Sequence, residues 1–455
     1  MREIQKHFRD YADRLFAGLG VDENLILQLK GEDSLFLRWN RAKVRQSTQV
    51  RQFEVNWTYQ WDGRQLELSE QLTLDLEQDA KRGLAQLARL KMQAAGLEKS
   101  HQLAPLSPAE TSVRVGELPA RDPAKIARQI EQASQDLDLI GFWCSGPMVR
   151  GVAHSKGLFL FEARDAFFFD YSIFTVSDAG ENKAVKGFFS EAQWDEDGWA
   201  TRWGQQILRQ KEDLALLRRP SRKLASGKYR VYLAPSAMSS MMETMKSESF
   251  SFLAYKHGRS LLKDFVDGMR RFSPRFSVTE DFELGFAPRF NRLGEIAPAQ
   301  IPLISEGHYR NSLVSGKTAR EYGVASNGGE DSGWETEAPR SYQIAAGELP
   351  SDQALAELGT GVWINETHYT NFSDLKTARI TGMTRYACFW VENGRIVEPI
   401  QDMRFDVSLF DLFGEDLVAL TKERKDFLDV GTYHLRVWAG SRLPGVLAQN
   451  FNFTL

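Results

Sequence analysis

The chain has 455 residues, 42% of them hydrophobic and 11% aromatic, so it is long enough for about two to three domains with buried cores. Lys and Arg number 57 against 61 Asp and Glu, giving a formal net charge of -4, which excludes a global positive field for nucleic acid or anionic lipid. The two cysteines, Cys144 and Cys388, are too few for a disulfide framework or a cysteine zinc cluster. No secretory signal is visible, and the apolar runs are too short or too interrupted by charge to span a bilayer. We therefore expect a soluble, cytoplasmic protein with no direct nucleic-acid or membrane partner.

Residues 1–220 alternate between helical and strand patterns, which predicts an N-terminal α/β domain with an antiparallel or mixed sheet covered by helices. The turn Asp62-Gly63 is a strong hairpin signal, and Asp122-Pro123 is typical of a helix start. The predicted helices cover 4–19, 75–95, 123–137 and 194–217, and the predicted strands cover 34–39, 50–61, 65–74, 139–149, 158–162 and 166–175.

The segment 96–121 is rich in Pro, Ser, Glu and Lys and is interpreted as a linker or an extended crossing strand. Pro, Ser and Gly near 220–226 predict a domain boundary, after which residues 221–455 are mostly β, as in a barrel-like or sandwich domain. The whole chain is therefore predicted to be α+β. Short helices are predicted at 261–269 and 318–323, and strands at 276–284, 301–307, 308–314, 361–365, 378–382, 385–392, 395–404 and 435–453.

The stretch 228–247 is a predicted strand followed by a methionine-rich helix, a common place for chemistry. Glu243 is the only acidic residue of this helix where catalysis would be expected, and Met241, Met242 and Met245 surround it. A carboxylate among thioethers has no partners for a metal ion. A packed amphipathic helix with one solvated Glu is therefore the first interpretation.

Two other motifs carry little weight as functional sites. His154 stands alone in the turn 151–157, where a histidine is more often a hydrogen-bonding turn residue than a ligand. The glycines of 326–333 lack the order that cradles a phosphate, so a nucleotide site is not indicated.

Several short motifs, in this order and spacing, resemble those of the TldD/PmbA family, also called modulators of DNA gyrase or U62 peptidases. Each motif is unspecific turn chemistry; their succession over most of the chain carries the resemblance. They are 151–157, 290–294, 304–307, 317–319, 381–385, 392–396 and Pro399.

Members of the TldD kind carry HExxxH on the helix after this strand, with a later Cys, and use the bound metal to cleave peptides. Such an ion lowers the pKa of its bound water toward 7, and the Glu accepts the proton. In this sequence Met242 stands at the first His, Glu243 at the Glu and Ser247 at the second His, and no Cys lies near the C-terminus. The resemblance therefore points to the PmbA (TldE) branch, which lacks the metal, and Glu243 would be a silent general base.

The resemblance also implies partners. We expect a peptide substrate bound as an extended strand and a dimer, either with a metal-bearing TldD-like subunit or with a second copy of this chain. Candidate peptide contacts are the aromatic strand 53–61 and the segment 381–385, although ordinary core packing is the preferred interpretation of each stretch taken singly. The predicted substrate-binding residues are His368, Tyr369, Thr384 and Arg385.

Two alternatives stay open. The chain is an active metallopeptidase, with zinc, if histidines outside the motif supply ligands, of which His368 is the most suggestive. It is a stand-alone homodimeric peptide-binding protein if no TldD-like companion exists. A serine mechanism from Ser236, Ser239 or Ser240 has no ordered triad in the sequence. No cofactor is expected under the first hypothesis.

Overall fold

The computed structural model of the chain describes residues 1–100, 103–119, 121–191, 195–330 and 337–454. The first part contains α1 (Arg2–Phe16), β1 (Glu23–Asn40), β2 (Lys43–Trp61), β3 (Arg64–Gln71), α2 (Leu76–Ala94), β4 (Thr111–Val115), α3 (Pro123–Ala133), β5 (Asp138–His154), β6 (Leu158–Val176), β7 (Asn182–Glu191) and α4 (Glu196–Leu217).

The second part begins with β8 (Gly227–Leu233), α5 (Pro235–Ser249), α6 (Phe252–Lys256), α7 (Lys263–Val266), β9 (Val278–Asp281), the 3-10 helix η1 (Phe282–Leu284), β10 (Gln300–Ser305), β11 (His308–Tyr309), α8 (Gly316–Tyr322) and β12 (Ser341–Ile344). It continues with the 3-10 helix η2 (Ser351–Gln353), α9 (Ala354–Leu358), β13 (Gly361–Ile364), β14 (Glu366–Asp374), β15 (Arg379–Arg385), β16 (Phe389–Glu392), β17 (Arg395–Pro399), β18 (Arg404–Ser408), α10 (Leu409–Leu412), β19 (Leu417–Leu428) and β20 (Gly440–Phe453).

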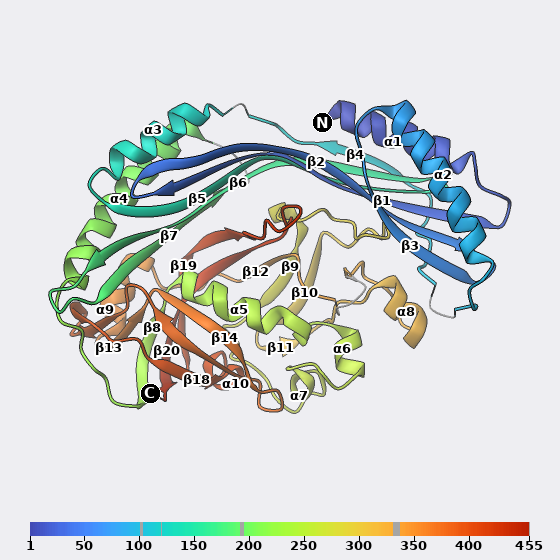
Figure 1. The fold of residues 1–455 in the computed structure, drawn as a ribbon. Helices are drawn as coiled ribbons and strands as arrows, with labels where there is room; N and C mark the ends of the chain where they lie inside the picture. Colours follow the sequence, from blue (N-terminus) through green and yellow to red (C-terminus); the bar gives the residue numbers. More distant parts are fainter. Residues whose placement is uncertain (101–102, 120, 192–194, 331–336, 455) are drawn as a thin grey trace.

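The first sheet has the strand order β3-β2-β1-β5-β6-β4, with β7 also paired to β6. Figure 1 shows it as a long arch over the second part, with α1 to α4 on its outer face. Alternating side chains explain this layering, because successive strand residues point to opposite faces. Leu29 of β1, Val55 of β2 and Val149 of β5 are buried in one cluster with Phe8 of α1 and Leu87 of α2.

Local signals in the sequence gave the right turns and helix starts. Asp62 and Gly63 both have positive φ (45° and 75°), as a two-residue hairpin turn requires. The Asp122 carboxylate accepts a hydrogen bond from the Ala124 N–H at 2.9 Å, so the predicted cap of α3 is confirmed.

Other predicted strands were wrong in extent or were missed. Residues 158–176 form one strand rather than two, since β6 pairs with β5 without interruption over residues 158–174. The strands β7, β12, β14, β18 and β19 were not predicted; β19 includes the charged run 422–426, which hides its strand character. The predicted strand 308–314 is reduced to His308–Tyr309 and the predicted helix 261–269 to Lys263–Val266. Trp194 and residues 331–333, included in two predictions, lie outside the described residues.

The second sheet is mixed and follows the order β11-β10-β9-β12-β20-β8-β13-β16-β17 among the described strands. A branch adds β18 and β19 on β20, β15 on β18, and β14 on β15. This order does not return to its first strand, so the described sheet is open rather than a closed barrel. The predicted α+β class, with a helix-covered first sheet and a mostly β second part, is confirmed.

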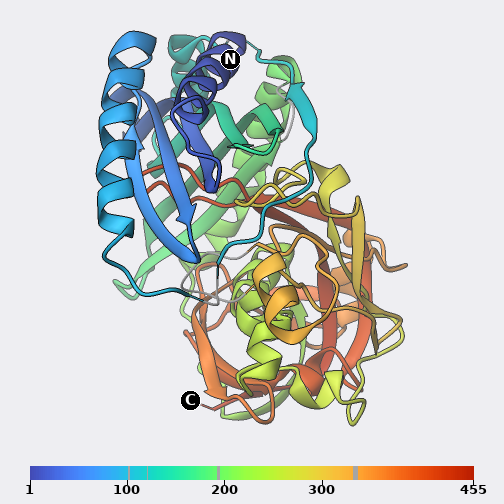
Figure 2. The same ribbon diagram turned by 90° about the vertical axis from the view of Figure 1, so that its right-hand side faces the viewer.

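The two parts are joined by side chains that reach across to main-chain carbonyls. Ser107 donates to the Leu293 carbonyl at 3.0 Å, and Ser190 donates to the Asp426 carbonyl at 2.8 Å. Figure 2 shows the first sheet above the second, with the chain between α2 and α3 crossing beside both. This crossing chain is the segment 96–121, and it carries β4, parallel to β6.

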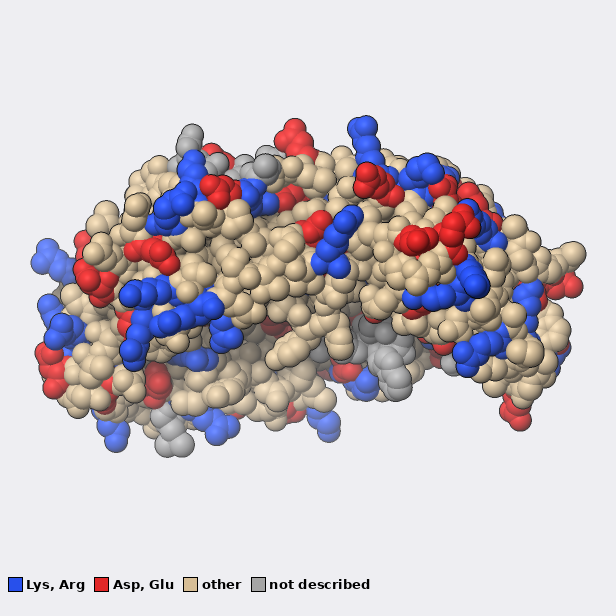
Figure 3. Space-filling view, turned by 45° about the horizontal axis from the view of Figure 1, so that its top comes forward, with Lys and Arg blue, Asp and Glu red and all other residues tan. Residues whose placement is uncertain are grey.

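The outer surface agrees with the nearly balanced charge of the sequence. On the face drawn in Figure 3, lysines and arginines are interspersed with aspartates and glutamates. Within the described part of the chain, no helix combines the length and apolarity that crossing a membrane needs.

Candidate functional site

Helix α5 places a polar face toward the first sheet because its methionines occupy the opposite face. Pro235 at the first turn starts the helix, and the buried residues recur three and four positions apart, as on one side of a helix. These buried residues are Met238, Met241, Met242 and Met245. The predicted amphipathic helix is thus confirmed.

A cavity of about 320 Å³ lies against the polar face of α5. The helix contributes Ser236, Ser239, Ser240, Glu243 and Lys246. The first sheet contributes residues of β6 and β7, and the second part contributes β14, the end of β19 and the start of β20. We call this cavity the α5 cleft. It lies where strands distant in the sequence meet.

The carboxylate of Glu243 forms an ion pair with a lysine of the same helix. Its Oε2 lies 2.7 Å from the Lys246 ammonium, one turn along the helix, and its side chain is 52% exposed. The ammonium group beside the carboxylate offsets its charge.

The α5 cleft does not provide the donor set of a zinc site. Met242 is fully buried in the core, so its thioether faces away from the cleft, and the Ser247 side chain lies outside the described atoms. Residues 1–100, 103–119, 121–191, 195–330 and 337–454 contain no group of three His, Cys, Asp or Glu that could hold a metal ion. Zinc prefers thiolate, imidazole and carboxylate ligands, so the residues present do not fit it, and we derive no step through a metal.

The deepest acidic group of the α5 cleft is Glu366, at the start of β14. Burial raises the pKa of Glu366 to about 7, opposed by the positive charges of Lys186 and Lys425 and by a hydrogen bond with Ser236. Burial likewise lowers the pKa of Lys425, which the Glu366 carboxylate opposes. Asp170 pairs with Lys186 at the same wall. The cleft can therefore hold or release a proton near neutral pH.

The sequence did not reveal Glu366, Lys186 or Lys425 as site residues. They belong to β14, β7 and β19, three of the strands that the pattern analysis missed. The only available signal was charge inside short β-prone runs, which is equally typical of solvated loops.

The four predicted substrate-binding residues lie on the neighbouring strands β14 and β15. His368 Nδ1 is 3.3 Å from Arg385 Nη1, and its ring centroid is 4.3 Å from that of Tyr369. Tyr369 is 79% exposed, whereas Thr384 is fully buried, and the Thr384 hydroxyl accepts the Met403 N–H. The structure thus brings His368, Tyr369 and Arg385 together at the surface and places Thr384 in the core.

Strand β14 connects this cluster to the α5 cleft. Ser240 of α5 donates to the Thr367 carbonyl at 3.1 Å, and Thr244 donates to Thr370 Oγ1 at 2.9 Å. Among the described strands β14 pairs with β15 alone, so its second edge carries backbone groups outside the sheet ladder. By contrast, residues 54–61 of β2 pair with both β1 and β3, so no peptide strand can add there.

The sequence of the second part matches a family model described as the PmbA/TldA metallopeptidase C-terminal domain, over residues 226–454. The chain belongs to the PmbA/TldD family. The matched residues include β8, α5 and every strand of the second sheet, so the α5 cleft is built largely from the family's C-terminal domain. A search of curated proteins found no match.

Solved structures share this fold over the whole chain. A candidate modulator of a DNA gyrase from Thermotoga maritima is 18% identical, with a TM-score of 0.77 over 98% of this chain and 100% of that chain. TldE from Thermococcus kodakarensis is 13% identical, with a TM-score of 0.77 over 99% and 100% of the two chains. A candidate modulator of DNA gyrase from Bacteroides thetaiotaomicron is 14% identical, with a TM-score of 0.73 over 100% and 99%. At these identities the likeness establishes the fold alone.

Proposed function

We propose that this chain is the non-metal, PmbA/TldE-like subunit of a cytoplasmic peptidase of the TldD/PmbA type. It binds an extended peptide and contributes one half of a cleft, while a metal-bearing TldD-like subunit cleaves the peptide. The observation that carries this proposal is the face of α5, where a polar cleft is kept but Met242 is buried and Glu243 is paired with Lys246.

The side of β14 that pairs with no described strand supports peptide binding as an added strand, although Ser240 already bonds the Thr367 carbonyl. Main-chain hydrogen bonds to such an edge read no side chains, which suits a binder of many unfolded sequences. Tyr369 and His368 stand on this strand and Arg385 on its neighbour, so an added peptide would meet an aromatic and a cationic side chain. The likeness to TldE from Thermococcus kodakarensis points in the same direction.

The test combines this chain with a metal-bearing TldD-like subunit. An unstructured peptide is incubated with each protein alone and with both together, and cleavage products are quantified. We expect cleavage by the mixture to exceed the sum of the separate reactions. Ser239→Trp, which fills the α5 cleft, should abolish this gain, whereas Gln205→Trp on the exposed face of α4 should leave it unchanged.

Two results would contradict the proposal. One is cleavage by this chain alone together with stoichiometric zinc, measured by elemental analysis of protein purified without chelators; it would favour an active metallopeptidase. The other is a mixture no more active than the metal-bearing subunit, which would favour a stand-alone homodimer.

A further inference from the structure

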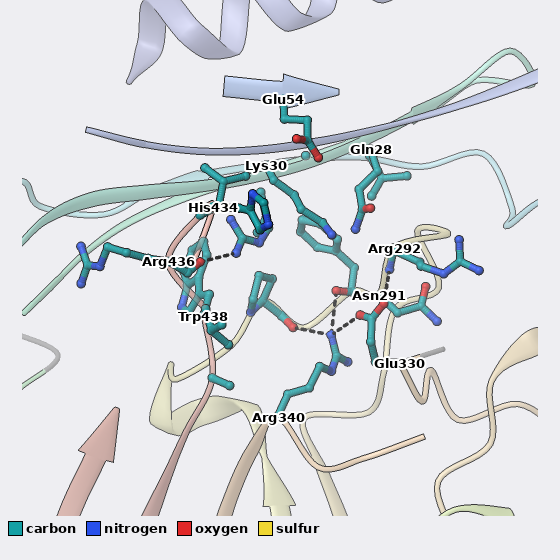
Figure 4. Close-up of a pocket in the computed structure, with 18 of the residues that line it drawn as sticks. Gln28, Lys30, Glu54, Asn291, Arg292, Glu330, Arg340, His434, Arg436 and Trp438 are labelled. Atoms are coloured by element: carbon teal, nitrogen blue, oxygen red, sulfur yellow. Dashed lines mark hydrogen bonds and ion pairs between the residues drawn. The ribbon is translucent and has the colours of Figure 1, made fainter. Parts of the chain in front are cut away.

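A second and larger cavity of about 660 Å³ lies between the inner face of the first sheet and loops of the second part. Figure 4 shows β1 and β2 above it and the loops around Asn291, Arg340 and Trp438 around it. The chain segment 433–439 forms one wall, and residues 427–430 and 440–441 on either side of that segment line the α5 cleft. The volume of this second cavity is typical of sites for small ligands or short peptide segments.

Strand alternation places charged residues on the roof of this cavity. Lys30 of β1 is directly opposite Glu54 of β2 on one side and Arg150 of β5 on the other. Their sequence neighbours Leu29 and Val149 point to the opposite face and are buried under the helices. The roof of the cavity is therefore lined by a row of charged side chains rather than by apolar ones.

Two cations of this row have no carboxylate partner. Within the described part of the chain, the Lys30 ammonium makes no ion pair or hydrogen bond, and Figure 4 shows it pointing into the cavity. The Arg150 guanidinium donates only to the carbonyls of Val149 (2.8 Å) and Arg436 (3.1 Å), which leaves further N–H donors. Like charges directly opposite each other on paired strands repel.

Burial makes it less favourable for Lys30 and Arg150 to be charged at such close range. It lowers the pKa of Lys30, and the Arg150 charge lowers it further. Burial also lowers the pKa of Arg150 to about 10, although Glu330 and Glu32 oppose the shift. Burial thus disfavours the charged form of both cations, and the nearby carboxylates offset this only in part.

The carboxylates of the cavity already have other partners. Glu54 accepts from Gln71 Nε2 at 2.9 Å. Glu330 is paired with Arg340 at 3.2 Å and accepts the Arg292 N–H at 3.2 Å; Figure 4 marks these contacts. They leave Lys30 and Arg150 available to an incoming anion.

We propose that Lys30 and Arg150 bind a carboxylate of the extended peptide. This rests on the proposed function only in assigning the carboxylate to a peptide. A singly charged carboxylate fits better than a phosphate, because Glu54 and Glu330 repel a second negative charge. The peptide N–H groups beside a carboxylate also suit the acceptor oxygen of Gln28, which lines the same cavity.

The test uses matched ligands with the full-length protein. Three fluorescent peptides of one unstructured sequence without Asp or Glu are compared by anisotropy: a free C-terminus, an amidated C-terminus, and an amidated peptide with one internal Glu. Binding of N-acetylglycine and N-acetylglycinamide, measured by calorimetry, reports on the site without requiring a peptide to bind as a strand.

The proteins compared are wild type, Lys30→Met, the charge-preserving Lys30→Arg, and Lys156→Met, which replaces an exposed lysine of the β5–β6 turn. Circular dichroism verifies that each variant is folded.

We expect wild type to bind the carboxylate ligands at least about tenfold more tightly than the amides, as a charge-assisted hydrogen bond supplies. Lys30→Met should remove this preference, and Lys30→Arg and Lys156→Met should keep it. Preference for the free C-terminus or for the internal Glu identifies which carboxylate enters.

Equal affinity of wild type for acids and amides, or a preference unchanged in Lys30→Met, overturns the proposal. If peptides bind and are cleaved with the partner but show no such preference, the proposed function stands and this site falls. If N-acetylglycine binds through Lys30 while no peptide does, the site stands and the proposed function falls.

Discussion

Glu366 lies where ionisation of a carboxyl group is harder than in water. Its side chain is enclosed by α5 and the first sheet, and burial is the largest cause of its raised pKa, near 7. Two lysines limit that rise, and one of them, Lys425, is itself held below its usual pKa by burial. The proton affinity of the α5 cleft is thus set by residues from three separate strands.

We predict that the Glu366 carboxyl titrates near pH 7, followed by carbon NMR of the labelled side chain. Between about pH 4.5 and 7 the folded protein keeps a proton that the unfolded chain releases, so the free energy of unfolding should fall as pH rises through this window. Above pH 7 this contribution is constant. Glu366→Gln should lack the titrating carboxyl resonance, and its free energy of unfolding should depend less on pH between about pH 4.5 and 7. A midpoint near 4.5 in wild type would show that Glu366 is solvated.

Helix α5 positions the α5 cleft, and its two faces have different roles. Its methionines hold it in the core of the second part, and its serines, Glu243 and Lys246 face the cleft. Because the helix is anchored by packing, the residues on its polar face can change without loss of the fold.

Substitutions on the two faces of α5 should therefore differ. We predict that Met242→Ala lowers the free energy of unfolding by about 2–5 kcal/mol, as buried truncations do. Glu243→Ala should change it by less than about 0.5 kcal/mol, since the ion pair it removes is largely exposed. Urea denaturation of both variants measures the contrast. A destabilisation by Glu243→Ala equal to that of Met242→Ala would mean that the carboxylate has a structural role.

At the scale of the whole molecule, the two parts are held together partly by one arginine. Arg436 is 4% exposed, and its guanidinium donates to Ser34 Oγ (3.2 Å), the Gly146 carbonyl (3.1 Å) and the Ala166 carbonyl (3.0 Å). These acceptors belong to β1, β5 and β6. The segment that carries Arg436 forms a wall of the larger cavity, so the same contacts fix that wall.

We predict that Arg436→Met lowers the free energy of unfolding by about 2–5 kcal/mol, because it leaves buried carbonyls without donors. The segment 431–439 should also become susceptible to limited proteolysis, which mass spectrometry of the fragments can locate. Arg436→Lys keeps the charge but not the planar guanidinium group, so its free energy of unfolding should lie between those of wild type and Arg436→Met. An unchanged cleavage pattern in Arg436→Met would show that this residue does not hold the segment.

The sequence alone determined the local features of this protein. Spacing of apolar residues gave α1, α2 and the two faces of α5, and short-range side-chain chemistry gave the Asp62-Gly63 turn and the Asp122 cap. The order of turn motifs gave the family. These features depend on residues a few positions apart, where the chain geometry is fixed by the backbone.

Only the tertiary structure decided which distant residues share a site. Glu366, Lys186 and Lys425 meet because β14, β7 and β19 converge on α5, and Lys30 lies opposite Arg150 through a register spanning 120 residues of sequence. It also decided that Thr384 is buried and that residues 54–61 of β2 are paired on both sides. Strand pairing and register depend on burial summed over whole sheets, so no short stretch of sequence specifies them.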